Sequence, residues 1–223
     1  MVRLPRLYAI LDSACFTERN DLFTVAEEFV SAGVTLIQYR NKSGNARVML
    51  EQARELKEHL GSHPNVAKNA PLGWGTQDSV RLIMNDRADL CLAADFDGVH
   101  VGQDDLSPES VRRIIGPDRW LGVSTHNAEQ LREADLTSAD YLAIGPVFAT
   151  SSKEKPDPVV GLDGVRRARA LTRKPLVAIG GITRENARSV IEAGADSVAI
   201  IGALLAVGEP SAKIAKDFLD RLR

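Results

Sequence analysis

Eight short apolar segments recur along the chain, and longer amphipathic segments separate them. The short segments are rich in Val, Ile and Leu, which is typical of parallel strands buried on both faces. Eight strand–helix units predict an α/β fold, a single (β/α)8 TIM barrel; the alternative is an open doubly wound sheet, but the strand count and the chain length favour the barrel. The expected strands span residues 7–11, 34–39, 80–84, 98–101, 120–123, 141–144, 176–179 and 197–200.

The segments between these strands carry helix signals. Residues 46–60 place apolar side chains at helical spacing. Ser107 followed by Pro108 predicts a helix start, because serine caps the first turn and proline fits its first position. Thr183 is expected to open another helix, which ends near Gly194.

One segment does not fit the repeat. Residues 61–79 are rich in Gly, Pro, Asn and Ser and have no periodicity. We expect residues 1–223 to form one barrel domain with a loop insertion at about 61–79, on the N-terminal face and away from the chemistry. A tolerated insertion is favoured over a functional loop, because long surface insertions cost little.

Composition excludes several classes of protein. Lys and Arg number 28 and Asp and Glu 30, a net charge of −2. This balance argues against a nucleic-acid binder or a polybasic membrane-surface protein, but it allows a local site for a small anion. Cys15 and Cys91 form neither a disulfide framework nor a zinc spacing, which indicates a reducing compartment. We see no signal peptide and no membrane-spanning apolar run, so we expect a soluble, cytoplasmic protein.

Polar residues gather where the expected strands end, which is where barrel active sites lie. After the second strand, alternation puts Gln38, Arg40 and, if the extension continues, Lys42 on one side. Two cations and an amide suit a pyrophosphate or another polyanion, with arginine supplying a planar fork and lysine a point charge. The other interpretation is a charged, solvated loop.

The third and fourth strands end in acidic residues. Asp86 follows the third strand, and Asp104 and Asp105 follow the fourth. Asp86 with one of the latter two would suit Mg²⁺, which one or two carboxylates plus substrate phosphates often hold. Helix capping is the alternative role of each Asp. His100, within the fourth strand, is either a hydrogen-bonded core residue or a catalytic one.

Small and hydroxyl residues follow the later strands. Ser124 ends the fifth strand, and residues 150–153 form a possible anion-binding loop or simply a polar loop. Gly181 and Gly202 follow the seventh and eighth strands. Backbone N–H groups at such glycines can approach a phosphate, and phosphate sites recur at this place in the barrel fold.

The sequence resembles the thiamine phosphate synthase family. The matching pieces, in family order from Tyr8 to about Leu205, are LIQYRNK, MNDRADL, DGVHVGQDDL, LGVSTH, GPVFATSSK, AIGGIT and ADSVAIIGAL. The resemblance implies a (β/α)8 barrel and Mg²⁺ as cofactor. Many members have serine where this chain has Gly202, so a hydroxyl contact to phosphate would be missing, and the family usually has a shorter stretch at 61–79.

The resemblance also implies the reaction. It couples 4-amino-2-methyl-5-hydroxymethylpyrimidine pyrophosphate with 4-methyl-5-(2-hydroxyethyl)thiazole phosphate, releasing pyrophosphate by a dissociative, Mg²⁺-assisted substitution. The implied pyrimidine pyrophosphate ligands are Gln38, Arg40, Lys42, Asn85, Ser124 and Lys153, of which Arg40, Lys42, Ser124 and Lys153 are the catalytic candidates. The implied metal ligands are Asp86 and Asp105, and the implied thiazole phosphate ligands are Thr150, Ser152, Gly181, Ile201 and Gly202.

Two other functions stay open at this point. A thiazole tautomerase of the related branch would share the barrel and the thiazole phosphate site, but intact Gln38, Arg40 and Lys42 with the Asp86 and Asp105 pair weigh against it. A non-catalytic phosphate-binding barrel would explain the glycines and little else. The expected partners are small molecules, without nucleic acid or membrane, and a homo-oligomer is possible.

Overall fold

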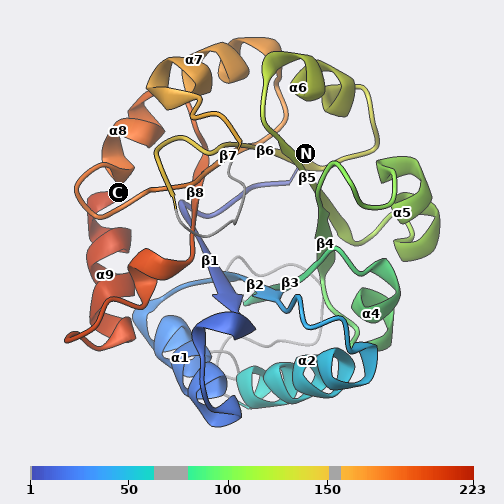
Figure 1. The fold of residues 1–223 in the computed structure, drawn as a ribbon, viewed down its shortest axis with the longest axis vertical. Helices are drawn as coiled ribbons and strands as arrows, with labels where there is room; N and C mark the ends of the chain where they lie inside the picture. Colours follow the sequence, from blue (N-terminus) through green and yellow to red (C-terminus); the bar gives the residue numbers. More distant parts are fainter. Residues whose placement is uncertain (1, 63–79, 151–156) are drawn as a thin grey trace.

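The computed structural model describes residues 2–62, 80–150 and 157–223, and in this part of the chain eight parallel strands close into a barrel (Figure 1). The strands follow each other in chain order, and β1 also pairs with β8, with Leu7 opposite Val198. This closure confirms the predicted (β/α)8 barrel and excludes the open sheet. The strands are β1 Leu7–Asp12, β2 Leu36–Arg40, β3 Arg81–Asn85, β4 Gly98–Val101, β5 Trp120–Thr125, β6 Tyr141–Ile144, β7 Leu176–Ile179 and β8 Ser197–Ile200.

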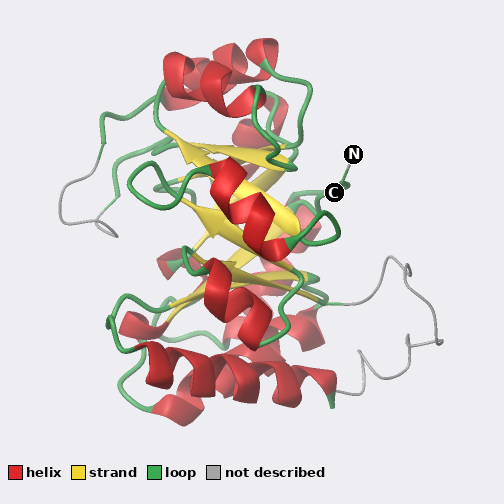
Figure 2. Ribbon diagram, turned by 90° about the vertical axis from the view of Figure 1, so that its right-hand side faces the viewer, coloured by secondary structure: helices red, strands yellow, loops and turns green. Residues whose placement is uncertain are grey.

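Helices surround the barrel on its outside, as the end-on and side views show (Figures 1 and 2). Asn45, Ser107 and Asn127 cap three of them, because their side chains accept hydrogen bonds from backbone N–H groups of the first turn. The predicted start at Ser107 is thus confirmed. The helices are α1 Arg19–Ala32, α2 Ala46–Gly61, α4 Ala88–Ala93, α5 Pro108–Ile115, α6 Ala128–Asp135, α7 Gly161–Leu171, α8 Ala187–Glu192 and α9 Ser211–Arg221, with 3-10 turns η1 Ser13–Cys15 and η2 Gly202–Leu204.

The strands bury two apolar layers. Alternate residues such as Leu7 and Ile37 face outward and pack under the helices in the larger core. Tyr8, Leu36 and Tyr141 belong to a second cluster of buried residues that fills the barrel interior. Successive side chains of a strand point to opposite faces, so only every second residue of a strand can point into the barrel interior.

Two expected boundaries are wrong for local reasons. The second strand begins at Leu36 rather than Val34, because Gly33 ends α1 in the left-handed region and the Val34 N–H bonds back to Phe29 O at 3.0 Å. The helix expected to open at Thr183 begins at Ala187. The predicted insertion lies, from residue 63 to 79, outside the described residues.

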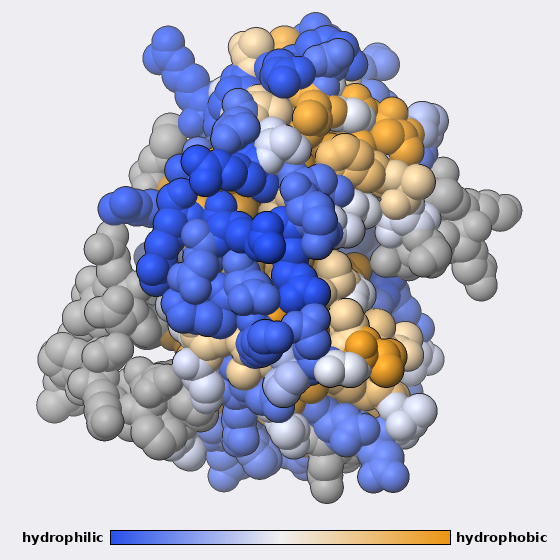
Figure 3. Space-filling model, turned by 90° about the vertical axis from the view of Figure 1, so that its left-hand side faces the viewer, coloured by the Kyte–Doolittle hydropathy of each residue, from blue (hydrophilic) through white to orange (hydrophobic). Residues whose placement is uncertain are grey.

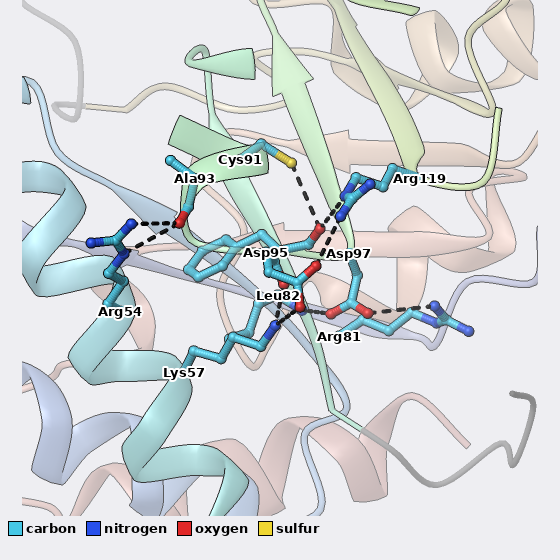
Figure 4. A network of polar contacts seen from close by, with 10 residues as sticks. Arg54, Lys57, Arg81, Leu82, Cys91, Ala93, Asp95, Asp97 and Arg119 are labelled. Atoms are coloured by element: carbon cyan, nitrogen blue, oxygen red, sulfur yellow. Dashed lines mark hydrogen bonds and ion pairs between the residues drawn. The ribbon is translucent and has the colours of Figure 1, made fainter. Parts of the chain in front are cut away.

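A charged cluster holds the turn between α4 and β4, at the N-terminal end of the barrel (Figure 4). Asp95 has a left-handed φ of 53° and accepts hydrogen bonds from Lys57 at 2.5 Å and Arg119 at 2.8 Å. Arg54 donates to the Ala93 carbonyl at 3.1 Å, near the carboxyl end of α4, where cations are favourable. The Lys57 hydrogen bond lowers the pKa of Asp95 below its usual range. This cluster is structural, because it lies at the far end of the strands from the cavity described below.

The outer surface is mostly hydrophilic on the side that carries α8 and α9, with apolar residues gathered toward one edge (Figure 3). Among the described residues, no helix combines the length and the apolar character that crossing a membrane requires.

Candidate active site

A cavity of about 440 Å³ opens at the C-terminal ends of the strands. This is the end at which (β/α)8 barrels carry their active sites. Lys42, Asp86 and Asp105 lie outside its lining, and Ser152 and Lys153 lie outside the described residues. The other predicted site residues all line the cavity: Gln38, Arg40, Asn85, Ser124, Thr150, Gly181, Ile201 and Gly202.

Arg40 enters the cavity from the end of β2 and forms an ion pair with Asp12, at the end of β1. The side chain of Asp12 is 8% exposed and that of Arg40 21%. Asp12 also accepts a hydrogen bond from the Ala14 N–H at 3.1 Å, which caps η1. The ion pair holds the Arg40 guanidinium through Nη1 and leaves its other N–H groups available to bind an anion. Asp12 was not predicted as a site residue, although an acidic residue directly after an expected buried strand is a usable signal.

Lys42 and Asp86 form a second ion pair beside the cavity. Burial raises the pKa of Asp86, the Lys42 hydrogen bond opposes that rise, and Asp105 adds to it through a hydrogen bond and its charge. Asp86 and Asp105, from consecutive loops, therefore do come together as predicted. Asp105 also accepts from the Gly102 N–H at 2.7 Å.

The two carboxylates fit magnesium. In the described part of the chain, no group of three or more His, Cys, Asp or Glu side chains could hold a metal. A site of two carboxylates needs oxygen ligands from the substrate, which is how Mg²⁺ is commonly bound.

Asn85 presents an unused donor. Its side chain is buried and lines the cavity, and its Nδ2 is the one buried side-chain N or O atom of the described residues without a hydrogen-bond partner. A buried polar group without a partner costs free energy, which a ligand acceptor would recover. Asn85 is thus prepared to donate to an oxygen of a bound molecule.

A group of hydrogen-bonded hydroxyl and imidazole side chains lies in the barrel interior, and its members Tyr8, His100 and Ser124 line the cavity. Tyr8 Oη and Tyr141 Oη are 3.0 Å apart, and Tyr141 Oη is 3.1 Å from His100 Nδ1. His100 Nε2 contacts Ser124 Oγ at 2.8 Å, and Gln38 Nε2 donates to Tyr8 Oη at 2.8 Å. Burial lowers the pKa of His100 to about 4, so the ring is neutral at pH 7.

The two tyrosines were not predicted as site residues, and His100 proves to be hydrogen-bonded and buried while still facing the cavity. Gly122 makes room for this group. A Cβ atom there would lie 2.2 Å from Tyr141 Cζ and 2.3 Å from His100 Nδ1, so no larger residue fits.

Glycines shape the opposite wall, after β7 and β8. Gly180 and Gly181 have φ values of 101° and 63°, in the left-handed region that favours glycine. A Cβ at Gly181 would lie 2.4 Å from the Ala149 carbonyl. Gly202 faces open space, with nothing within 4 Å of a built Cβ. The predicted phosphate-binding glycines therefore line the cavity with accessible backbone, next to Ile201 and Thr150.

His126 and Asp157 also line the cavity, and neither was predicted as a site residue. His126 Nδ1 contacts the Gly145 carbonyl at 2.7 Å and Asp157 Oδ2 at 3.5 Å. This contact joins the end of β5 to the segment that leads into α7. Asp157 lies far from the end of β6, so the rule that site residues follow a strand could not have predicted it.

The fold and the cavity together define a (β/α)8 barrel with a candidate active site at the C-terminal ends of its strands. Comparison with known proteins narrows this class. The family model described as thiamine monophosphate synthase matches residues 7–204. The chain therefore belongs to the thiamine monophosphate synthase family, and the activity that names this family is that of a transferase.

Individual relatives agree with this assignment. The chain is 58% identical over 207 residues to the thiamine-phosphate synthase of Koribacter versatilis, covering 92% of this chain and 90% of that protein. It is 41% identical to the enzyme of that name from Chloroflexus aurantiacus, covering 93% and 88%. The solved thiamine phosphate pyrophosphorylase of Pyrococcus furiosus superposes with a TM-score of 0.79 at 30% identity, covering 97% of this chain and 95% of that one.

Proposed function

We propose that this chain is a thiamine-phosphate synthase that joins 4-amino-2-methyl-5-hydroxymethylpyrimidine pyrophosphate to 4-methyl-5-(2-hydroxyethyl)thiazole phosphate, releasing pyrophosphate. The observation that carries the proposal, beside the family, is the unpartnered Asn85 donor in a cavity that Arg40 also lines. A donor and a cation in one cavity suit a phosphate-bearing ligand, and both lie on the side opposite the glycine wall. Two anionic substrates could thus be bound at once.

The proposed division of the cavity follows its two walls. Gln38, Arg40, Asn85 and Ser124 would hold the pyrimidine pyrophosphate, with Lys42 and Lys153 adding charge. Gly181, Gly202 and the backbone at Ile201 would hold the thiazole phosphate, with Thr150 and Ser152. The lining glycines Gly181 and Gly202 support this, because a backbone without side chains leaves its N–H groups accessible to an anion.

Asp86 and Asp105 would hold Mg²⁺ together with the pyrophosphate. When bound, the ion would neutralise negative charge on the leaving pyrophosphate. Arg40 and Lys42 would act on the same charge, and Asn85 would donate to a phosphate oxygen. The substitution we propose is dissociative: the pyrimidine methylene–oxygen bond breaks first, and the thiazole nitrogen attacks the resonance-stabilised cation. The cavity would then act chiefly by positioning the two substrates.

The experiment that tests this function is direct. Purified protein with both substrates and Mg²⁺ should form thiamine phosphate and pyrophosphate in equal amounts, measured by chromatography. No product with any divalent metal would refute the proposal. Isomerisation of the thiazole without coupling would favour the tautomerase, and ligand binding without any turnover would favour a non-catalytic phosphate-binding barrel.

The finer cellular assignments are also proposals. The net charge of −2 and the two free cysteines support a cytoplasmic protein that acts on small molecules rather than on nucleic acid. A homo-oligomer would be detected by light scattering of the purified protein.

Asp86→Asn should weaken Mg²⁺ binding at least about tenfold, while thiazole phosphate binding changes little. Asparagine keeps the shape of the side chain and tolerates the φ of 61° at this position, so the effect comes from the lost charge. Calorimetry of both ligands measures the split, and Asp104→Asn, in the neighbouring exposed carboxylate, is the matched control. Equal weakening of both ligands would contradict the division of the cavity.

Gly202→Ser should tighten thiazole phosphate binding about threefold to tenfold, because a hydroxyl donor can reach a phosphate from this position. The space around Gly202 is open, so the substitution costs no repacking. Fluorescence or calorimetric titration measures the change. Gly61→Ser, at the end of α2 and also in open space, serves as the control and should leave the affinity unaltered. An unchanged affinity in Gly202→Ser would show that the phosphate does not bind here.

A further inference from the structure

A continuous chain of buried hydrogen bonds crosses the barrel interior and connects two residues of the proposed pyrimidine subsite. It runs from Gln38 through Tyr8, Tyr141 and His100 to Ser124, with contacts of 2.8 to 3.1 Å. Five different strands contribute one residue each, and along the hydrogen-bonded chain these strands are β2, β1, β6, β4 and β5. Tyr8 and Tyr141 are fully buried at 1% and 0% exposure, so neither hydroxyl can exchange its partner for bulk water.

The direction of the first half of this chain follows from the donors. Gln38 Nε2 belongs to an amide NH2 group, which can donate hydrogen bonds but cannot accept them, so it donates to Tyr8 Oη. Among the described residues, the other hydrogen-bond partner of Tyr8 is Tyr141, and the Tyr8 O–H must therefore donate to it. If Tyr141 donated to Tyr8 instead, the buried Tyr8 hydrogen would have no acceptor, which folded proteins avoid.

The direction of the second half follows in the same way. Tyr141 already accepts from Tyr8, so its own hydrogen goes to His100 Nδ1. A neutral imidazole that accepts at Nδ1 carries its proton on Nε2. His100 Nε2–H therefore donates to Ser124 Oγ. The hydrogen of the Ser124 hydroxyl has no other side-chain acceptor among the described residues, and it is left to donate into the cavity.

The two ends of the chain thus offer opposite groups to a ligand. Ser124 offers an O–H donor, and the amide oxygen of Gln38, whose nitrogen contacts Tyr8, offers an acceptor. An aminopyrimidine has the matching groups, because its amino group donates and its ring nitrogens accept. In the same orientation a 4-oxo pyrimidine does not match, because an accepting oxygen replaces the amino donor and the neighbouring ring nitrogen carries a hydrogen instead of accepting one.

We infer that Tyr8, Tyr141 and His100 are positioning residues that fix Ser124 as a donor and so select a 4-aminopyrimidine over its 4-oxo counterpart. This inference rests on the proposed function, because it concerns the pyrimidine substrate of the same cavity. Removing the Tyr141 hydroxyl interrupts the chain. His100 can then take either tautomer, and Ser124 can turn its hydrogen toward the ring and accept from the ligand instead.

Binding of two probes tests the inference. Calorimetry in the presence of Mg²⁺ compares the 4-aminopyrimidine pyrophosphate with its 4-oxo analogue. The unmodified protein should bind the amino form at least about 100-fold more tightly, because a mismatched buried hydrogen-bonding group is strongly rejected. Tyr141→Phe should reduce this ratio about tenfold by weakening the amino form while the oxo form changes little. A merely structural role would weaken both probes equally.

Control variants distinguish a loss of selectivity from a general effect on folding and from a failure of the proposed function. Tyr39→Phe removes another buried tyrosine hydroxyl, one that donates to Gln52 at 2.7 Å outside the chain described above, and should leave the ratio unchanged. His100→Leu should lower the ratio as Tyr141→Phe does, and His100→Gln, which keeps one donor and one acceptor, should restore part of it. An unchanged ratio in Tyr141→Phe, or no discrimination by the unmodified protein, overturns the inference while thiamine phosphate synthesis stands. Failure of the unmodified protein to synthesise thiamine phosphate overturns the proposed function instead.

Discussion

Replacing Arg40 with alanine is expected to lower kcat by about 10³ and to destabilise the barrel at the same time. The catalytic loss follows from the role proposed for Arg40, since its guanidinium would stabilise charge on the leaving pyrophosphate. The loss of stability follows from Asp12, whose side chain is only 8% exposed and would lose its ion-pair partner. Breaking a buried pair costs about 3–5 kcal/mol, and the 21% exposure of Arg40 lowers the expectation to about 2 kcal/mol. Steady-state kinetics and urea unfolding measure the two effects.

A second substitution separates the loss of activity from the loss of stability. Asp12→Asn combined with Arg40→Ala removes the unpaired charge, and asparagine can still accept the Ala14 N–H that caps η1. The double variant should regain most of the lost stability and none of the lost activity. Recovery of activity along with stability would mean that Arg40 acts only by holding the fold together.

Gly181→Ala is expected to raise the KM for thiazole phosphate at least about 100-fold and to cost about 2–3 kcal/mol of stability. Two physical effects combine, since the residue has a φ of 63° and its Cβ would lie 2.4 Å from the Ala149 carbonyl oxygen. The backbone must move to relieve that contact, and the N–H groups that would bind the phosphate move with it.

Gly44→Ala is the matched control for this substitution. Gly44 has a similar φ of 77° but nothing within 4 Å of a built Cβ. It should lose about 1 kcal/mol of stability and keep its KM. Equal effects of both substitutions on KM would show that backbone strain alone, rather than the approach of backbone to phosphate, explains the result.

The fold was predictable because its signal is local. Each strand is a short apolar run, and the side-chain period of two correctly put Gln38 and Arg40 on the same side of β2. Strand order and closure also followed, because repeated βα units have few ways to assemble. Helix starts were less predictable: Ser107 caps its helix as expected, whereas the turn after Thr183 delays α8 to Ala187.

The site was predictable only where its residues end a strand. Asp86 was predicted from its position after a strand, and the structure brings Asp105 beside it. The role of Asn85 was implied only by the family resemblance. The pairing of Tyr8 with Tyr141 could not be predicted, because these residues are 133 positions apart and meet only across the closed barrel. Such contacts depend on the register of several strands at once, which no local pattern contains. The roles proposed for Ser152 and Lys153 remain predictions from the sequence.

The charged cluster around Asp95 has a consequence for how this protein can adapt. Its cations and carboxylates lie at the N-terminal ends of β4 and β5 (Figure 4). The cavity occupies the opposite ends of the same strands. Heat tolerance can therefore be raised or lowered by exchanging ion pairs at one end, because networks of this kind gain weight as temperature rises. The reaction at the other end need not change, so a substitution in this cluster can shift the melting temperature while the cavity keeps its geometry.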